Sequence, residues 1–410
     1  MSLPFALNPA LENLPVYQPG RPIEEVAREL GLDERRVIKL ASNENPLGPS
    51  PAALAVLKLA AKKLNLYPDG NAFYLKQKLA AKLQVAPANL ILGNGSNEIL
   101  EFLAHALLRP GVDAVMSEFC FVVYPLVTRL LGANPVTVPA RQYAHDLPAM
   151  LKAVTPVTKA VFIANPNNPT GTLAPAREIL EFLDQVPPGV VVIMDEAYIE
   201  FLEEPLDLVP LVLSGDKPNL ILLRTFSKVY GLAGLRLGYG IGHPDLIAAL
   251  EKIRQPFNVN SLAQVAGLAA LDDTAHVQKT RENNSAGRKF FEETLRRMGI
   301  EFIPTHANFI LARVGPPSTP PPSASSIPSP HEVGRGPGRG DPSIQGSQGQ
   351  NAPPGAVEGK RVFEELQSRG VIVRPMAAYG LPEWIRISIG SPRENHRCAR
   401  ALKTVLHKKT

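Results

Sequence analysis

Seven short apolar runs, separated by segments with helical spacing, constrain the fold of this chain more than any other feature. They span residues 90–92, 114–116, 136–138, 160–164, 190–194, 220–223 and 235–239. The runs are too short for buried helices, several are β-branched, and turn residues bound them, which is typical of strands buried on both faces of a sheet. Because helical segments lie between several of them, as right-handed crossovers require, we predict an α/β fold with a mostly parallel sheet.

The pattern changes after about residue 256 and indicates a smaller α+β domain. A polar helix is expected over 280–298 and a second helix over 362–367, with strands at 309–311, 371–373 and 385–389. A last helix begins cleanly, with Ser391 as N-cap, Pro392 in the first turn and Glu394 three residues on. We therefore expect an N-terminal arm (1–45) that packs with the small domain, a large domain (46–275) and a small domain (276–410).

One segment differs in composition from both domains. Residues 316–357 comprise 42 positions, of which 11 are Pro, 7 are Gly and 7 are Ser, with no aromatic residue. Such a stretch buries too little apolar surface to offset the entropy lost on ordering it. We predict a disordered insertion within the small domain.

Composition excludes several classes of protein. The net charge is +5, but the basic residues are scattered and form no basic stripe of the kind that predicts nucleic-acid binding. The excess of positive charge would suit an anionic substrate. Cys120 and Cys398 lie far apart without metal-ligand spacing, as in a reducing compartment. Because the chain has neither a leader-like start nor an apolar run of about 20 residues, we expect no membrane association and a cytoplasmic location.

Lys228 has the most informative setting of any single residue. A lone lysine is usually surface charge, but this one follows an apolar run and the hydroxyl-bearing Ser227, with Arg236 eight positions further on. Lysine amines form Schiff bases with carbonyl compounds. Ser227 and Arg236 could together grip a phosphate, because the arginine fork matches phosphate oxygens and the intervening glycines permit a close turn.

Three further segments follow predicted strands. Asp195 is either a helix N-cap or the partner of a protonated pyridine nitrogen, and Tyr198 could donate to a ring oxygen. The Asx-Pro turn at 165–171 could place the Asn168 amide against that same oxygen. The turn at 93–98 leads into a helix, so the backbone at Ser96 and Asn97 could complete a phosphate site.

Together these motifs resemble fold-type I pyridoxal-phosphate aminotransferases. More narrowly, the segments 17–20, 40–46, 67–70 and 195–201 are similar to those of the histidinol-phosphate aminotransferase family, over nearly the whole chain except the insertion. The resemblance implies a mostly parallel seven-stranded sheet in the large domain and a smaller α+β domain. It also implies a homodimer with shared active sites.

The resemblance implies a role for each matching residue. Lys228 is the Schiff-base lysine and proton carrier, Asp195 pairs the pyridine nitrogen, and Asn168 and Tyr198 bond the ring oxygen. The remaining cofactor contacts would come from Ser96, Asn97, Phe121, Ser227 and Arg236, and from Tyr67 of the neighbouring subunit. Arg386 would clamp the α-carboxylate of glutamate or 2-oxoglutarate, while Arg374, Tyr17 and Asn45 would complete the substrate site.

The implied reaction transfers an amino group between L-histidinol phosphate and 2-oxoglutarate in histidine biosynthesis. Aromatic amino acid aminotransferases share nearly every motif, and a threonine-phosphate decarboxylase would keep the same cofactor site. A non-catalytic pyridoxal-phosphate-binding regulator is a further alternative. The intact Lys228, Asp195 and Arg386 argue against it.

Overall fold

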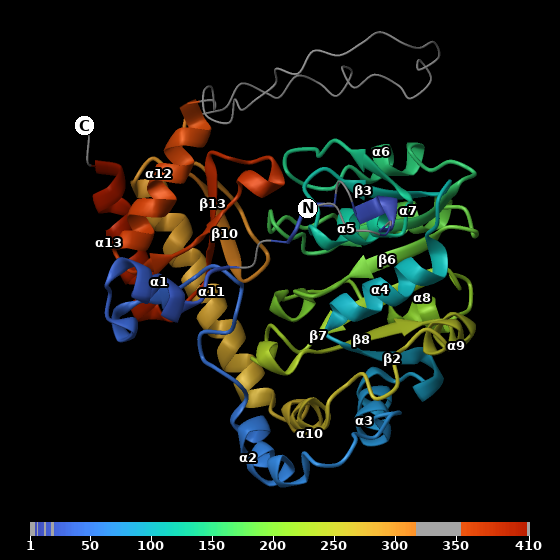
Figure 1. Cartoon of the computed structure of the whole chain (residues 1–410). Coiled ribbons are helices and arrows are strands. Elements are labelled where there is room, and N and C mark those ends of the chain that lie inside the picture. The colour runs from blue at the N-terminus through green and yellow to red at the C-terminus, as the bar shows by residue number, and fades with distance from the viewer. Residues whose placement is uncertain (1–4, 6, 12–13, 18–19, 317–353, 408–410) are drawn as a thin grey trace, which may run out of the picture.

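A seven-stranded sheet forms the larger part of the molecule (Figure 1). The computed structural model describes residues 5, 7–11, 14–17, 20–316 and 354–407. The strand order is β2-β8-β7-β6-β5-β3-β4, parallel except for β8, which runs antiparallel to both β2 and β7. The bounds are Leu90–Asn94 (β2), Asp113–Ser117 (β3), Asn134–Val138 (β4), Thr158–Ala164 (β5), Val191–Asp195 (β6), Leu220–Thr225 (β7) and Leu237–Gly242 (β8). The prediction of a mostly parallel α/β sheet is confirmed.

One predicted strand is displaced along the chain. The expected strand at 235–239 is wrong in its start, because Ala233–Leu235 form a short 3-10 helix and β8 begins at Leu237. Arg236 between them has a φ of +56°, a left-handed conformation that no strand accommodates.

Helices cover both faces of the large sheet, and successive residues of its strands point to opposite faces. On β5, Phe162 packs with Leu100 and Tyr124 on one side, while Ile163 packs with Phe182 on the other. A strand buried on both faces needs a continuous apolar run, which explains the sequence pattern. The helices are Pro51–Ala60 (α2), Phe73–Leu83 (α3), Ser96–Leu107 (α4), Val123–Leu130 (α5), Leu147–Lys152 (α6), Ala176–Gln185 (α7), Val209–Leu213 (α8), Pro244–Glu251 (α9) and Ser261–Ala270 (α10).

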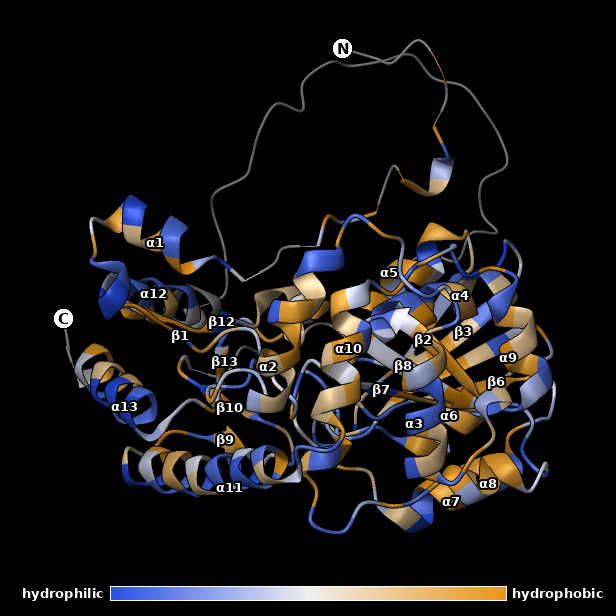
Figure 2. Cartoon of the chain, turned by 90° about the horizontal axis from the view of Figure 1, so that it is seen from below, coloured by the Kyte–Doolittle hydropathy of each residue, from blue (hydrophilic) through white to orange (hydrophobic). Residues whose placement is uncertain are grey.

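A four-stranded antiparallel sheet, in the order β12-β13-β10-β9, forms the second part of the molecule. Its strands are Phe302–Ile303 (β9), Phe309–Arg313 (β10), Arg374–Pro375 (β12) and Trp384–Ser388 (β13), and it packs with α11 (Thr274–Arg297), α12 (Pro354–Ser368) and α13 (Pro392–His407). In Figure 1 the long helix α11 extends from α10 beside the large sheet to this smaller sheet. Figure 2 shows that α11 and α13 carry mixed polar and apolar residues along their lengths, as surface helices do.

The N-terminal segment contributes a short strand to a separate two-stranded sheet. Strand β1 (Ile38–Lys39) pairs in parallel with β11 (Val371–Ile372), and helix α1 (Ile23–Leu30) buries Val26 and Ala27 against Ile372. Beyond β1, Ser388 N–H of β13 donates to the Leu40 carbonyl, so the chain then runs alongside β13. It reaches the interior between the two sheets at Asn43, which is 2% exposed.

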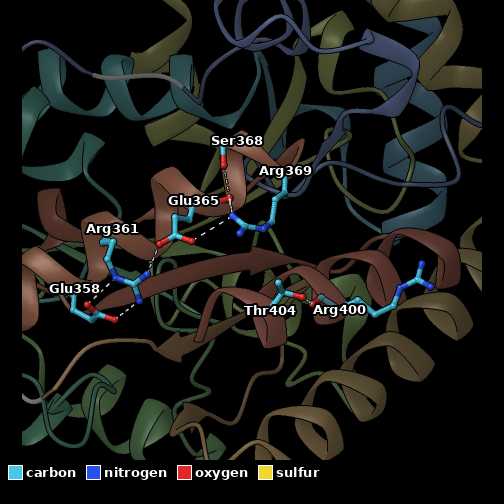
Figure 3. Close-up of polar contacts among 7 residues, drawn as sticks. All are labelled: Glu358, Arg361, Glu365, Ser368, Arg369, Arg400 and Thr404. Atoms are coloured by element: carbon cyan, nitrogen blue, oxygen red, sulfur yellow. Dashed lines mark hydrogen bonds and ion pairs between the residues drawn. The ribbon is translucent and has the colours of Figure 1, made fainter. Parts of the chain in front are cut away.

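Helix α12 corrects one expected boundary. The helix begins at Pro354, inside the segment 316–357 expected to be disordered, and extends well beyond the expected 362–367. Arg361 pairs with Glu358 and Glu365, and Arg369 pairs with Glu365, at the three- and four-residue spacings that stabilise helices (Figure 3). These pairs stabilise the helix beyond its first turn, while proline at the first helical position is compatible with its start. The rest of the predicted insertion, 317–353, lies outside the described residues.

Over the part of the chain that the structure describes, no helix is both long enough and apolar enough to cross a bilayer.

Candidate active site

A cavity of about 800 Å³ opens at the carboxyl ends of β5, β6 and β7, where parallel α/β sheets usually bind ligands. Most of the side chains expected to bind cofactor or substrate line it: Tyr17, Ser96, Asn97, Phe121, Asn168, Asp195, Tyr198, Ser227, Lys228 and Arg236. They come from segments that are far apart in the sequence. The large sheet brings them to one edge.

One end of the cavity is built to receive an anion. Helix α4 starts here at Ser96, preceded by Gly95 with a φ of +80°. Arg236, the residue directly before β8, approaches from the other side, and its Nη1 lies 3.5 Å from the Ser227 hydroxyl. A Cβ at Gly95 would stand 2.6 Å from the Arg236 guanidinium, so only glycine allows this approach. Helix N–H groups, a hydroxyl and an arginine fork together suit a phosphate.

Asp195 lies deep in the cavity at the end of β6 and is 6% exposed. Tyr124 donates to its Oδ2 at 2.7 Å, and the Ala197 N–H donates to its Oδ1 at 3.1 Å. Burial raises the pKa of the Asp195 carboxyl, while these hydrogen bonds and the charge of Lys228 act in the opposite direction. A cationic partner such as a pyridinium would favour the ionised form further.

Lys228 faces the same space from the loop after β7. Its Nζ lies 3.4 Å from the Asn43 carbonyl oxygen and 5.5 Å from the centre of the Tyr198 ring. Desolvation, followed by the nearby Arg386 charge, lowers the pKa of Lys228 to about 8. An amine with such a pKa is partly neutral at physiological pH, as a nucleophile or proton carrier requires.

The Asn168 turn meets the smaller sheet at Arg386. Arg386 Nη1 donates to Asn168 Oδ1 at 2.7 Å and Nη2 donates to the Ala41 carbonyl at 3.2 Å. The guanidinium lies 5.1 Å from the Phe309 ring centre, and its buried Nε has no hydrogen-bond partner among the described residues. Since Oδ1 of Asn168 is used in this way, its NH2 group is the end left to donate into the cavity. Both Asn-Pro bonds in this turn, before Pro166 and Pro169, are cis.

Arg374 adds a second cation beside Arg386. The two residues are direct partners on the antiparallel strands β12 and β13, so their side chains share one face of the smaller sheet. Tyr17 lies under the Arg374 guanidinium, 5.8 Å from ring centre to Cζ. Neither arginine lines the cavity itself, but Arg386 bonds to Asn168 and Arg374 lies over Tyr17, and both of those residues do. Two arginines directly behind the cavity wall suit a substrate with two anionic groups.

Two expected site residues make their contacts elsewhere. Asn45 donates to the Val229 carbonyl at 2.9 Å and to the Thr280 hydroxyl at 3.1 Å. Tyr67 is 83% exposed and stacks on Phe257 at 4.8 Å. Within this chain, Tyr67 does not reach the site formed by Lys228 and Asp195.

Three residues that the sequence analysis did not select take part in the site. Tyr124 bonds to Asp195, and Asn43 and Ser388 bond to one another beside Tyr198. Tyr124 comes three positions after Phe121, at the start of α5, and this spacing from a predicted site residue was the only sequence signal for it. Asn43 and Ser388 are 345 positions apart, so no local pattern connects them.

Comparisons with known proteins agree with this geometry. Residues 35–402 match the model of the family described as aminotransferase class I and II. A protein of Akkermansia muciniphila named histidinol-phosphate aminotransferase is 45% identical over 99% of this chain and 100% of its own length. A protein of Ralstonia nicotianae named histidinol-phosphate aminotransferase 2 is 46% identical, covering 95% of this chain and 94% of its own.

Solved structures give the same result. Histidinol-phosphate aminotransferase from Sinorhizobium meliloti, in complex with pyridoxal-5'-phosphate, has a TM-score of 0.82 at 27% identity, over 98% of this chain and 97% of that one. An aspartate aminotransferase of Thermus thermophilus, at 21% identity and a TM-score of 0.74 over 98% of this chain and 99% of its own, shares the fold. The chain therefore belongs to the class I and II aminotransferase family.

Proposed function

We propose that this chain binds pyridoxal phosphate and transfers an amino group from L-histidinol phosphate to 2-oxoglutarate, giving 3-(imidazol-4-yl)-2-oxopropyl phosphate and L-glutamate. The observation that carries the proposal is the meeting of three groups in one cavity. These are the Lys228 amine, the buried Asp195 carboxylate and the anion site at Ser96 and Arg236. The names of the relatives supply the substrate.

The cavity fits the cofactor at each of its polar groups. Ser96, Ser227 and Arg236 would hold the phosphate, Asp195 would pair with the ring nitrogen, and the Asn168 amide and Tyr198 hydroxyl would donate to the ring oxygen. Phe121, at the cavity wall in edge contact with Tyr124, would cover one ring face. When bound, pyridoxal phosphate supplies an electron-withdrawing ring that stabilises negative charge on the substrate carbon.

The protein's own residues would perform the proton transfer. The Lys228 amine, with its lowered pKa, would accept the proton from the substrate carbon and return it to the carbon on the other side of the transferred nitrogen. Burying an unpaired carboxylate is costly. A cationic ring nitrogen beside Asp195 would offset that cost and keep the carboxylate ionised. Tyr124 holds that carboxylate in place.

The two arginines that contact the lining residues Asn168 and Tyr17 suit the two alternating substrates. Arg386 would bind the α-carboxylate of glutamate or 2-oxoglutarate through its planar fork. Arg374 and Tyr17 would bind the second anion, which is either the side-chain carboxylate of glutamate or the phosphate of histidinol phosphate. One shared anion position would let unlike substrates follow each other in a ping-pong cycle.

We also propose that the active unit is a cytoplasmic homodimer, with Tyr67 reaching the cofactor phosphate of the partner subunit. An exposed apolar surface supports this: Leu54, Leu59, Leu64, Leu66, Tyr67, Phe73, Tyr74 and Phe257 are each at least 44% exposed. Patches of this kind usually mark interfaces. Sedimentation at twice the monomer mass is expected, and a monomer with full activity would contradict the shared site.

The central test uses purified protein mixed with pyridoxal phosphate. A visible absorbance band that depends on Lys228 is expected, and Lys228→Ala should abolish both the band and transamination. Lys152→Ala, at an exposed position on α6, is the matched control and should change neither. A band and activity that survive Lys228→Ala would refute the assignment of the lysine.

Substrate choice needs its own measurement. We expect kcat/KM for histidinol phosphate to exceed the values for phenylalanine and tyrosine. A preference for the aromatic amino acids would instead make this chain an aromatic amino acid aminotransferase. Because the motifs at the cofactor are common to both, only the kinetic comparison separates them.

A further inference from the structure

Asn43 connects the reacting end of the cavity to the smaller sheet. It is 2% exposed and has a φ of +55°, a conformation that asparagine adopts more readily than most residues. Its carbonyl oxygen accepts from Lys228 Nζ at 3.4 Å and from Asn308 Nδ2 at 3.1 Å. Its side chain contacts the Tyr198 hydroxyl at 3.0 Å and the Ser388 hydroxyl at 3.0 Å.

These contacts form a chain of hydrogen bonds whose direction is fixed at one end. The backbone N–H of Asn43 can only donate, and it donates to Ser388 Oγ at 2.8 Å. The Ser388 hydroxyl proton is then available to Asn43 Oδ1. This orients the amide so that Nδ2 faces Tyr198, whose oxygen must accept because an amide NH2 group has no acceptor.

The proton of Tyr198 is therefore directed away from Asn43. Tyr198 lines the cavity, so its O–H is left to donate into the space where the cofactor's ring oxygen would lie. Burial raises the pKa of the Tyr198 hydroxyl, while Arg386 and the hydrogen bond from Asn43 lower it. The titratable and charged groups around this hydroxyl are Lys228, Asp195, Arg386, Tyr379 and Tyr124.

The hydrogen-bond chain starts at Ser388 on β13, the strand that also carries Arg386, which is proposed to bind the substrate carboxylate. Ser388 and Arg386 are two positions apart on β13, so their side chains share a face. Arg386 donates to the Ala41 carbonyl and Ser388 bonds to Asn43, which ties the segment 41–43 to this strand at two points. A shift of β13 relative to Tyr198 would therefore act on the hydroxyl through Asn43.

We propose that Asn43 is a positioning residue that, together with Ser388, fixes the direction in which the Tyr198 hydroxyl donates. The inference rests on the proposed binding of pyridoxal phosphate. A donor to the ring oxygen stabilises its negatively charged form, so loss of that donor raises the pH at which the absorbance of the bound cofactor changes. The pH midpoint of that absorbance change therefore reports whether the Tyr198 hydroxyl donates to the ring oxygen, and it does so without a measurement of turnover.

The experiment compares the midpoint in four cofactor-loaded proteins: wild type, Asn43→Asp, Tyr198→Phe and the double variant. A carboxylate at 43 can only accept, so it draws the Tyr198 proton away from the cavity. We expect Asn43→Asp to raise the midpoint by about one pH unit more when Tyr198 is present than when Tyr198→Phe has removed the hydroxyl. The two proteins that carry Tyr198→Phe measure the effect of the added charge alone.

Two neutral variants complete the design. Asn43→Gly keeps the left-handed backbone and removes the amide, and Ser388→Ala frees the amide to rotate. Each should raise the midpoint by less than Asn43→Asp and should have no effect when Tyr198 is replaced by Phe. Thermal unfolding and circular dichroism verify that each variant is folded, and Asn43→Gly replaces Asn43→Asp if the latter does not fold.

The outcomes separate the two proposals. Equal shifts with and without the Tyr198 hydroxyl, or no shift in any Asn43 or Ser388 variant, would overturn the role of Asn43 and leave cofactor binding intact. A wild-type protein without any Lys228-dependent band would overturn the proposed function, and the role of Asn43 with it.

Discussion

The hydroxyl of Tyr124 donates to the carboxylate of Asp195 across 2.7 Å, and both side chains are buried. Tyr124 comes from α5 and Asp195 from the end of β6, so the hydrogen bond joins two elements that form one wall of the cavity. It also supports a buried carboxylate that would otherwise carry an unsatisfied oxygen.

Tyr124→Phe should raise the pKa of Asp195 further, because it removes a hydrogen bond that favours the ionised form. We expect about tenfold weaker binding of pyridoxal phosphate and a loss of about 1.5–3 kcal/mol in the free energy of unfolding. Tyr239→Phe removes another buried hydroxyl, one bonded to Arg224, and is the control. It should lower stability without changing cofactor affinity, whereas equal cofactor affinities in both variants would argue against the role of Tyr124.

Gly95→Ala should damage the anion site. The added Cβ would stand 2.6 Å from the Arg236 guanidinium, so the arginine must move and phosphate binding should weaken by at least about tenfold. Gly111→Ala is a matched control, because Gly111 also has a positive φ, +86°, but has open space around its Cβ position. It should cost only the backbone strain, about 1 kcal/mol, and leave cofactor affinity unchanged. A similar cofactor affinity in the two variants would contradict the anion site.

Incorporation of pyridoxal phosphate into the cofactor-free protein should depend on pH through Lys228. Only the neutral amine attacks a carbonyl, so the rate should rise with pH around a midpoint of about 8, well below the 10.5 of an ordinary lysine. Because Arg386 contributes to the lowering, Arg386→Gln should move the midpoint upward. Stopped-flow absorbance over a pH range of about 6.5 to 10 measures both, since it spans the lowered pKa. An Arg386→Gln midpoint below that of wild type would exclude this electrostatic coupling.

His145 should make the protein less stable in acid. It is buried beside the end of β5, with Nε2 2.9 Å from the Ala164 carbonyl oxygen, and burial lowers its pKa to about 4 from 6.5. The folded protein therefore keeps His145 neutral while the unfolded chain takes up a proton below about pH 6.5. The free energy of unfolding should fall by about 2–3 kcal/mol between about pH 6.5 and about pH 4 from this group alone.

His145→Gln should reduce that acid-dependent loss by the same amount, as measured by urea unfolding at several pH values. His396→Gln, at an exposed position on α13, is the control and should leave the slope unchanged. An unchanged slope in His145→Gln would contradict a buried neutral histidine.

The sequence by itself determined the class of fold and pointed to most of the residues that line the candidate site. Short continuous apolar runs such as 190–194, bounded by turn residues, indicate strands buried on both faces. Asp195 follows that run directly, and Lys228 comes five positions after the run 220–223. Since the carboxyl ends of parallel strands meet at one edge of the sheet, residues read from separate motifs had to converge there. Local spacing was sufficient for these residues because each is positioned by the strand that it follows.

Only the tertiary structure decided the contacts that cross between the sheets. The bonds of Asn43 to Tyr198, Lys228 and Ser388, and of Arg386 to Asn168, join residues more than 150 positions apart. Helix α12 also begins earlier than composition indicated: it starts at Pro354, and proline is favourable at the first position of a helix. Local sequence patterns predict where a strand or helix lies and which of its faces is buried. The partners of a side chain across a cavity depend instead on how the two sheets pack together, and that packing is the sum of many contacts between distant residues.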